Sequence, residues 1–497
     1  MTTTPLPTAS TELPSLPESF RTVSVPGSGR PGDNVSRWRK FLAFAGPGFM
    51  VSVGYMDPGN WATDLAGGSR YGYALLWVVL ASNLMAILLQ TLCARLGLVT
   101  GKDLAQACRD FYKKPAALAL WILCEIAIVA CDLAEVIGSA VALNLLFGMP
   151  LLWGVLITGL DVLLILGLSK FGFRKLEAVV ITLVATVAGC FLLEMILAKP
   201  EWGAVGLGLI TPRLPDADAL FIALGILGAT VMPHNLYLHS SIVQTRAHDR
   251  SKDGITEAIR YNTLDTVIAL GAAFFVNAAI LVLAGAVFHT GGKAVEELGD
   301  AHALLKPLLG GAAATAFAVA LLASGQSSTI TGTLAGQIVM EGFLKIRVEP
   351  WLRRLITRGL ALIPAVIMIV VTGGKNTVGL LIVSQVVLSL QLSFAIFPLV
   401  MFTSDRKRMG DFVNPIWLSV LAYIVCAVIA SLNVKLLWDT AHDPAKTGAW
   451  GVPAFFATAI GMAAFSLYVV FVYKRKDEPA SPYAPKPDVP IIEGNDH

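Results

Sequence analysis

The stretch DPGN at residues 57–60 interrupts an apolar segment of helical length, and MPHN at residues 232–235 interrupts a second one. Each interruption places a proline and polar side chains where the bilayer makes unpaired backbone groups and charges unfavourable. A chain tolerates this cost when the broken helices surround a buried site for an ion or a small solute. The two stretches therefore predict a substrate site between two unwound membrane helices.

The composition supports a membrane protein. Of the 497 residues, 55% are hydrophobic and 14% are charged, and the mean hydropathy is +0.70. A soluble globular protein carries about 25% charged residues. The six cysteines form no CxxC pair, so we interpret them as small packing residues rather than as a disulfide framework or a zinc site. The chain is predicted to be an all-α polytopic membrane protein.

About 20 apolar residues are needed to cross a bilayer as a helix. If the N-terminus is cytoplasmic, 29 of the 37 Lys and Arg residues fall on the cytoplasmic side, and the excess alternates loop by loop. This bias predicts cytoplasmic termini in a multi-pass protein of the cell membrane. The twelve predicted spans are 42–66, 73–97, 116–146, 151–169, 177–198, 218–245, 262–290, 311–341, 355–373, 376–402, 413–435 and 452–473.

The broken helices are separated by five spans, which predicts two five-helix inverted repeats with helices 1 and 6 unwound at their centres. Polar, proline-rich stretches flank the apolar region and are predicted to be disordered cytoplasmic tails. The predicted parts are a tail over 1–40, a transmembrane domain over 41–475 and a tail over 476–497. Within the domain, repeat one covers about 42–198, repeat two about 218–402, and the additional helices about 413–473.

Proline leaves the carbonyl four residues earlier without its helical partner. Pro58 therefore frees the carbonyl of Gly54, and Pro233 frees that of Ala229. Gly59 loosens the first break further. Two bare carbonyls, one from each break, become available to a substrate.

The side chains at the breaks indicate which substrate. Asp57 and Asn60 lie one helical turn apart and offer a carboxylate and an amide oxygen, and Met232 adds a thioether. Mg²⁺ and Ca²⁺ prefer oxygen alone, whereas a thioether favours softer first-row metals. This mixture suits Mn²⁺ or Fe²⁺, with Cd²⁺, Co²⁺ and Zn²⁺ as further cargo. No permanently bound cofactor is expected.

Three runs resemble the signatures of the Nramp family (natural resistance-associated macrophage protein family): DPGN at 57–60, GATVMPHNLYLH at 228–239 and GQSSTITG at 325–332. The resemblance covers about residues 42–435. It implies a bacterial-type, proton-coupled manganese and iron importer with a leucine-transporter-type fold. The implied metal ligands are Asp57, Asn60, Met232 and the Ala229 carbonyl, joined in an occluded state by the Gly54 carbonyl and Gln385, for which Gln391 is a nearby alternative.

Acidic residues in the span over 116–146 fall on one polar stripe of an otherwise apolar helix: Glu125, Asp132 and Glu135. Candidate counter-charges stand at the start of the span over 355–373: Arg353, Arg354 and Arg358. The stripe is either a proton path or a structural ion-pair network. The resemblance favours a path from Asp57 past Asp132 and Glu135. Asp57 is expected to be the first proton acceptor, because metal binding at a carboxylate displaces its proton.

Two histidines follow the second break. We expect His234 to act in hydrogen bonding, gating or proton handling rather than as a metal ligand. His239 is either a packed histidine or a supporting one, and Pro58, Gly59 and Pro233 are predicted to support gating. Asp265 is expected to be solvated at the cytoplasmic end of its span.

The main alternative is an amino-acid symporter of the same architecture. A membrane enzyme is disfavoured because the chain has no nucleophile–base pair and no HExxH motif, and a primary pump because it has no nucleotide-binding loop. Basic loops such as 406–408 are interpreted as topology determinants, with no nucleic-acid partner expected. The predicted partners are divalent metal ions, protons and the lipid bilayer, and the chain is expected to function as a monomer.

Overall fold

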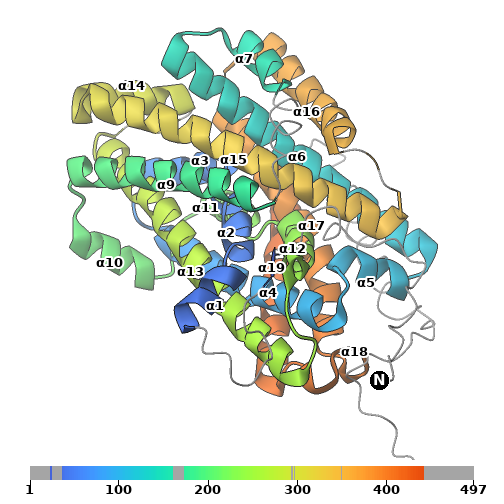
Figure 1. Ribbon diagram of the computed structural model, residues 1–497. Coiled ribbons are helices and arrows are strands. Elements are labelled where there is room, and N and C mark those ends of the chain that lie inside the picture. The colour runs from blue at the N-terminus through green and yellow to red at the C-terminus, as the bar shows by residue number, and fades with distance from the viewer. Residues whose placement is uncertain are drawn as a thin grey trace, which may run out of the picture.

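The computed structural model describes residues 23–24, 36–160, 173–292, 295, 297–346, 348, 350–375 and 377–441. This part of the chain is almost entirely helical (Figure 1). Nine of its helical segments are long and apolar enough to cross a membrane. The prediction of an all-α polytopic protein is confirmed. The predicted span over 452–473 and residues 161–169 of the span over 151–169 lie outside the described residues.

The first predicted break is present. The segment consists of α1 (Arg37–Phe44), α2 (Pro47–Ser52), the 3₁₀ turn η2 (Gly54–Met56) and α3 (Pro58–Tyr71). Asp57 is extended, with φ −68° and ψ 166°, and its side chain caps α3 by accepting the backbone N–H of Asn60. Pro58 takes the first position of α3, where its missing N–H costs no helical hydrogen bond. The predicted single span over 42–66 is therefore a chain of short pieces.

The second predicted break is also present. α11 (Ala217–Thr230) ends before Val231, and α12 (Pro233–Ile242) begins after Met232, whose φ of −66° and ψ of 122° are not helical. α12 continues into the 3₁₀ turn η3 (Val243–Thr245). Proline at the first position of α12 makes the same kind of restart as Pro58 makes in α3.

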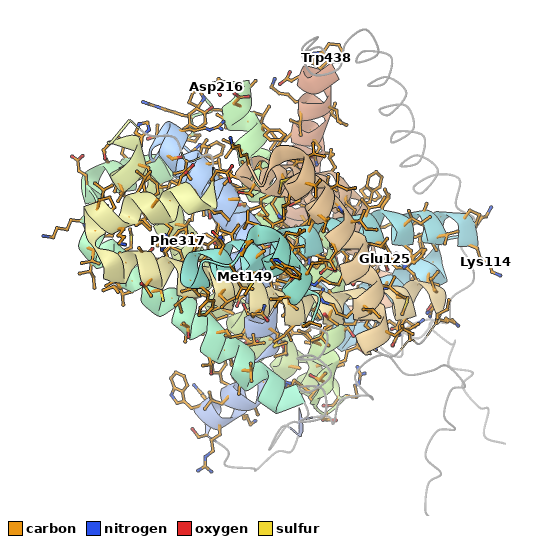
Figure 2. All side chains as sticks on the ribbon, turned by 90° about the horizontal axis from the view of Figure 1, so that it is seen from above. Lys114, Glu125, Met149, Asp216, Phe317 and Trp438 are labelled. Carbon is orange, nitrogen blue, oxygen red and sulfur yellow. The ribbon has the colours of Figure 1, made fainter. Side chains whose placement is uncertain are left out.

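Long helices enclose the two broken ones, and α6 and α15 lie along each other (Figure 1). Figure 2 shows α6 extending from Lys114 at the edge of the molecule past Glu125 towards Met149, which follows its far end. The long helices are α4 (Leu76–Thr100), α6 (Lys114–Phe147), α9 (Phe173–Ala198), α13 (Lys252–Ala284), α15 (Gly311–Leu344), α16 (Pro350–Thr372), α17 (Thr377–Thr403) and α19 (Ile416–Ala441). The shorter elements are α5 (Leu104–Phe111), α7 (Leu151–Thr158), α10 (Trp202–Ile210), the π-helical η4 (Gly285–His289), α14 (Leu298–Leu309), α18 (Arg406–Met409) and η5 (Gly410–Phe412).

Glycines let the enclosing helices approach the breaks closely. A Cβ added to Gly138 of α6 would lie 2.2 Å from Cβ of Pro58. A Cβ added to Gly228 of α11 would lie 2.1 Å from the carbonyl oxygen of Gln385 on α17. Small residues at helix contacts are typical of membrane bundles. Here they bring α6 and α17 against the two unwound segments.

The prediction for Asp265 is wrong. Its side chain is fully buried, and it accepts the backbone N–H groups of Gly46 and Gly48 at 3.3 and 2.6 Å. These N–H groups belong to the start of α2, where a carboxylate satisfies donors that have no partner within the helix. Asp265 therefore ties α13 to the first broken helix rather than facing solvent.

The structure describes only part of the segment over 1–40, for which a disordered tail is predicted. Strand β1 (Val23–Ser24) pairs in parallel with β2 (Arg246–Ala247), and α1 begins at Arg37. The predicted C-terminal tail over 476–497 lies outside the described residues.

Candidate metal site

The carboxylate of Asp57, at the first break, is fully buried. Its Oδ1 accepts both the backbone N–H and the side-chain amide of Asn60, each at 2.8 Å. Its Oδ2 lies 3.7 Å from Sγ of Cys131 on α6. Within the described chain no lysine, arginine or histidine forms an ion pair with Asp57. The negative charge of this carboxylate is stabilised by hydrogen bonds from neutral groups.

Oxygen atoms from both breaks converge on one point, the side-chain nitrogen of Asn60. This nitrogen lies 2.8 Å from Oδ1 of Asp57, 3.2 Å from the Gly54 carbonyl and 3.1 Å from the Ala229 carbonyl. The two carbonyls are those expected to be freed by the prolines. A half-turn of the Asn60 amide would bring its own oxygen to this point, since the two ends of an amide have the same shape.

Met232 brings sulfur to the same region. Its Sδ accepts a hydrogen bond from the amide of Asn235 at 3.4 Å. A Cβ added to Gly54 would lie 3.1 Å from this sulfur, so the thioether sits against the first break. Met232 also packs with Cys131 of α6 and Leu388 of α17 in one buried cluster. The second break thus contributes both a carbonyl oxygen and a sulfur.

Gln385 on α17 lies against Gly59, where an added Cβ would be 2.0 Å from its Nε2. That nitrogen donates to Oγ of Ser384 at 3.0 Å, while the buried Oε1 has no hydrogen-bond partner. Gln391 is buried too, but the structure places Gln385 against the first break. Gln385 is therefore the better placed of the two predicted candidates.

The acids of α6 are paired with the arginines of α16, as expected. Glu125 contacts Arg353 at 2.8 Å. Arg354 bridges the next two acids, through an ion pair with Asp132 and a contact of 3.0 Å to Glu135. Apart from the partly exposed Glu125, these side chains are almost fully buried. The predicted ion pairing is confirmed.

Two further contacts complete this network around Glu135. Arg358 approaches its Oε2 at 3.8 Å, and the hydroxyl of Thr329 on α15 donates to the same oxygen at 3.0 Å. The other carboxylate oxygen lies 4.0 Å from Sγ of Cys131. Cys131 therefore stands between the Asp57 carboxylate and the acid–arginine network.

The two histidines have different surroundings. His234 is buried at the start of α12, and its Nδ1 has no hydrogen-bond partner. Nδ1 of His239 lies 3.0 Å from Oε1 of Gln90 on α4, and Nε2 of Gln90 donates to the hydroxyl of Tyr55 at 3.0 Å. His239 is thus a packed histidine that links α12 to α4 and η2. Neither ring contributes to the oxygen cluster around Asn60.

Sequence reasoning missed two residues that support the site, Asn277 and Ser324. The amide of Asn277 on α13 donates to the Tyr55 carbonyl at 2.6 Å and lies 3.4 Å from Oδ1 of Asn60. The hydroxyl of Ser324 on α15 donates to the Met56 carbonyl at 2.5 Å. Both are polar residues within apolar spans, and this feature of the sequence could have identified them.

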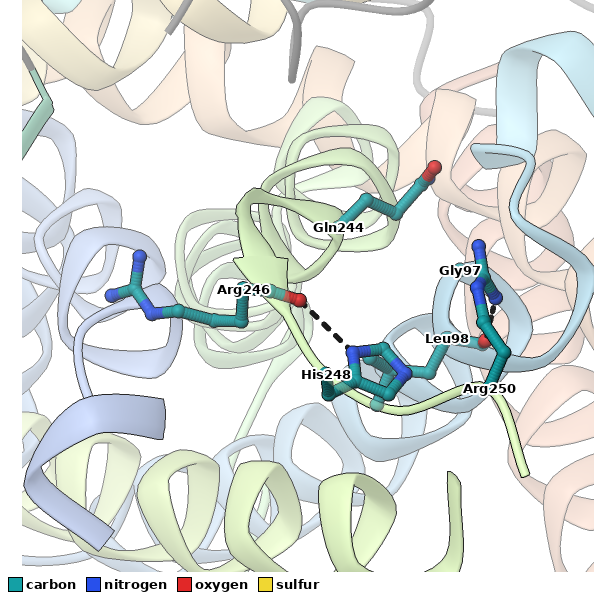
Figure 3. A pocket seen from close by; sticks show the side chains of 6 residues that line it. All are labelled: Gly97, Leu98, Gln244, Arg246, His248 and Arg250. Carbon is teal, nitrogen blue, oxygen red and sulfur yellow. Dashed lines mark hydrogen bonds between the residues drawn. The ribbon is translucent and has the colours of Figure 1, made fainter. Parts of the chain in front are cut away.

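A separate pocket of about 190 Å³ lies away from these residues, at the end of α4 and the segment after η3 (Figure 3). Its arginines already hold backbone oxygens. Arg246 donates to the carbonyls of Phe44 and Ala45, and Arg250 donates to that of Leu98 at 2.8 Å. The pocket therefore does not offer free cationic groups to a substrate.

Within the described residues, no group of three or more His, Cys, Asp and Glu side chains could hold a metal ion. The donors around Asn60 are instead a carboxylate, backbone carbonyls, an amide and a thioether. Such a mixed set binds less tightly than a cluster of charged ligands. That is suited to an ion that must leave again.

Comparison with known proteins agrees with this geometry. The chain is 59% identical over 428 residues to a protein of Nostoc sp. named divalent metal cation transporter MntH, covering 85% of this chain and 96% of the relative. It is 60% identical over 410 residues to a protein of the same name from Agrobacterium fabrum, covering 82% and 89%.

Solved structures give the same result. A manganese transporter of Eremococcus coleocola matches with a TM-score of 0.84 at 39% identity, covering 92% of this chain and 98% of that one. Mhp1, a nucleobase-cation-symport-1 family transporter, matches with a TM-score of 0.54 at 16% identity, which shows that the leucine-transporter-type fold is shared. Residues 48–439 match the family described as natural resistance-associated macrophage protein-like. The chain belongs to the Nramp family.

Proposed function

We propose that this chain imports divalent transition metal ions, Mn²⁺ and Fe²⁺ foremost, by alternating access coupled to proton symport. Cd²⁺, Co²⁺ and Zn²⁺ are expected to use the same path. The proposal is supported by relatives named divalent metal cation transporters and by a structural neighbour named a manganese transporter. The chain is a transporter and not an enzyme.

One observation carries the proposal: oxygens from both broken helices surround the Asn60 side-chain nitrogen within 3.2 Å. In this structure the partly positive N–H₂ group occupies the centre of three oxygens. A divalent cation bound beside this point, rather than on it, would be within reach of the same oxygens. A half-turn of the Asn60 amide would present its oxygen to the ion, and Met232 would add sulfur. Gln385, with its unpartnered Oε1, completes the donor set in an occluded state.

This donor set selects against the commoner hard cations. Mg²⁺ releases its water reluctantly and demands near-ideal octahedral oxygen geometry. Ca²⁺ takes six to eight oxygens, more than the cluster supplies. A thioether sulfur favours softer first-row metals. We propose that Met232 is the ligand that separates transition metals from Ca²⁺ and Mg²⁺.

The breaks also explain how the site could open to one side at a time. Asp57, Val231 and Met232 lie outside helical geometry, so small changes of their backbone angles can reorient the adjoining half-helices. Hinges of this kind are a few residues at the ends of elements. Pro58, Gly59 and Pro233 keep these positions from joining into continuous helices.

Protons enter the proposal through the carboxylates. A metal binds an ionised carboxylate, so binding at Asp57 displaces any proton that it carries. Asp132 and Glu135, held by Arg354, lie beyond Cys131 and are proposed to carry the proton onward, with His234 taking part. Glu125, Arg353 and Arg358 extend the network along α6 and α16. The same network also holds helices together, and these roles are compatible.

We further propose that both termini are cytoplasmic in the cell membrane, as the distribution of Lys and Arg predicts, and that the monomer is the functional unit. Amino-acid symport is the weaker alternative. The carboxylate of Asp57, with no paired cation in the described chain, would repel the carboxylate of such a substrate.

The test is transport by purified full-length protein in liposomes. A fluorophore quenched by Mn²⁺ reports metal entry, and a pH-sensitive dye inside the vesicles reports proton entry. We expect Mn²⁺ to enter and to acidify the vesicle interior. Uptake of amino acids without Mn²⁺ uptake would contradict the proposal, and Mn²⁺ entry without a pH change would contradict the coupling.

A further inference from the structure

Cys131 lies directly against the candidate site. It is buried on α6, and its Sγ is 3.7 Å from Oδ2 of Asp57. The other oxygen, Oδ1, is occupied by the two N–H groups of Asn60. A thiol is only a weak hydrogen-bond donor, so this contact leaves Oδ2 available to another partner. The face of Asp57 that remains open is the face that Cys131 adjoins.

Met232 packs beside Cys131. It shares one buried cluster with Cys131, together with Ala127 and Leu388. Because these two residues pack together next to the Asp57 carboxylate, a cation bound by that carboxylate could be reached by two sulfur atoms, one from the second break and one from α6. Gln385 gives an independent indication of a ligand, because its buried Oε1 has no hydrogen-bond partner and it lies against Gly59, next to Asn60.

The other five cysteines show no contact with a carboxylate in the part of the chain that the structure describes. The structure describes all six, and all are free thiols. Among them Cys131 is the one whose sulfur contacts carboxylates, at 3.7 Å to Asp57 and 4.0 Å to Glu135. Cys124, seven residues earlier on α6, is equally buried but lies in the general apolar core. Burial alone therefore does not account for the position of Cys131.

We propose that Cys131 is a specificity-determining residue that contributes a second sulfur donor to the Asp57 site and so favours thiophilic cations. This inference rests on the proposed function and deepens it. Soft ligands select soft metals, so the second sulfur raises the affinity for Cd²⁺ more than that for Mn²⁺. A serine at the same position would offer a harder oxygen of nearly the same size.

The direct test counts sulfur atoms around the metal. Purified full-length protein is loaded with one equivalent of Cd²⁺ at fixed pH, and X-ray absorption fine structure is recorded at the cadmium edge. We expect two sulfur neighbours in the wild type and in Cys124→Ser, and one in Cys131→Ser. A single sulfur neighbour of Cd²⁺ in the wild type would overturn the inference. This outcome is decided by the wild-type protein alone and does not depend on whether the variants fold.

A transport measurement gives the functional consequence. In vesicles, Cd²⁺ competes with Mn²⁺ uptake, and we expect Cys131→Ser to raise the half-inhibiting Cd²⁺ concentration about tenfold while the KM for Mn²⁺ changes less than about threefold. Equal loss for both ions would indicate a packing role and overturn the inference. If wild-type vesicles take up no Mn²⁺ at all, the proposed function fails, and the sulfur count still decides the role of Cys131.

Discussion

Asp57 and Glu135 are buried carboxylates on either side of Cys131, yet their surroundings are opposite. Asp57 is held by the N–H groups of Asn60 and by a thiol. Glu135 is held by Arg354 at 3.0 Å and approached by Arg358 at 3.8 Å. One cluster has a negative charge and no resident cation among the described residues, whereas the other carries its cations as side chains.

This difference separates two uses of buried charge. A buried carboxylate without a fixed counter-charge is costly, and a mobile cation lowers that cost when it binds. A carboxylate paired with arginine is already compensated, so it can hold helices together and exchange protons without attracting metal. Metal binding is expected at the Asp57 cluster and not at the acid–arginine network.

The largest expected effect comes from neutralising the unpaired carboxylate. Asp57→Asn keeps an oxygen that can accept the Asn60 N–H groups but removes the charge. We expect Mn²⁺ uptake into vesicles to fall at least about 100-fold, beyond the loss typical of residues that only support a ligand. Asp218→Asn, an exposed acid in the first turn of α11, is the matched control. Substantial Mn²⁺ uptake by Asp57→Asn would show that the Asp57 carboxylate is not a metal ligand.

The second prediction breaks the paired cluster instead. Arg354→Met keeps length but leaves Asp132 and Glu135 buried without their shared cation. Breaking a buried ion pair costs about 3–5 kcal/mol, so we expect a clearly lower melting temperature in detergent. Adding Asp132→Asn and Glu135→Gln should restore much of the loss. An unchanged melting temperature in Arg354→Met would show that the network contributes nothing to stability.

A third prediction concerns the chemistry of the unpaired cluster. Met232→Ala removes the thioether and leaves an oxygen-dominated donor set. We expect Ca²⁺ and Mg²⁺ to compete with Mn²⁺ uptake about tenfold more effectively. Met340→Ala, a buried methionine near the far end of α15, is the control. If competition by hard cations stays as in the wild type, sulfur does not set selectivity.

The smallest effect concerns Asp103, a buried carboxylate outside the membrane helices. Asp103 caps α5 between α4 and α6 and accepts the Gln106 N–H at 2.8 Å. Burial raises the pKa of Asp103 to about 7, against the opposing effect of that hydrogen bond and of the Arg109 charge. Like Asp57, it relies mainly on neutral donors, but no cation is expected to bind there.

Because the folded-state pKa of Asp103 is raised, the folded protein binds more protons than the unfolded chain. Its contribution to stability is present below about pH 4 and is lost as the pH rises through about 7. Asparagine is also a good helix cap, so Asp103→Asn should gain stability relative to the wild type between pH 5 and pH 8. The melting temperatures of the wild type and of Asp103→Asn, measured across that pH range, test this. A difference between the two that does not change with pH would contradict it.

The sequence predicted the features that follow from local chemistry. Pro58 and Pro233 end their helices because each lacks an N–H, and the structure has both restarts at these residues. The arginines of α16 were expected to meet the acids of α6 because buried charges need partners, and they do. Proline acts on the backbone within a few residues, and a buried charge requires a partner of opposite sign. Both effects can therefore be predicted from a single sequence.

Features that depend on how helices are rotated against one another were missed. Cys131 was interpreted as a packing residue because nothing in its neighbourhood along the chain shows that it faces Asp57. Asp265 was expected in solvent because its position in the span does not reveal that the start of α2 covers it. The choice between Gln385 and Gln391 likewise depends on which face of α17 meets Gly59.

The most direct test of the account is the position of the metal itself. Crystals of the wild-type protein soaked in Mn²⁺ would show the ion by its anomalous scattering. We predict one peak between the two breaks, within coordination distance of the Asp57 carboxylate, the Ala229 carbonyl and the Met232 sulfur. A peak at the acid–arginine network, with none beside Asp57, would contradict it.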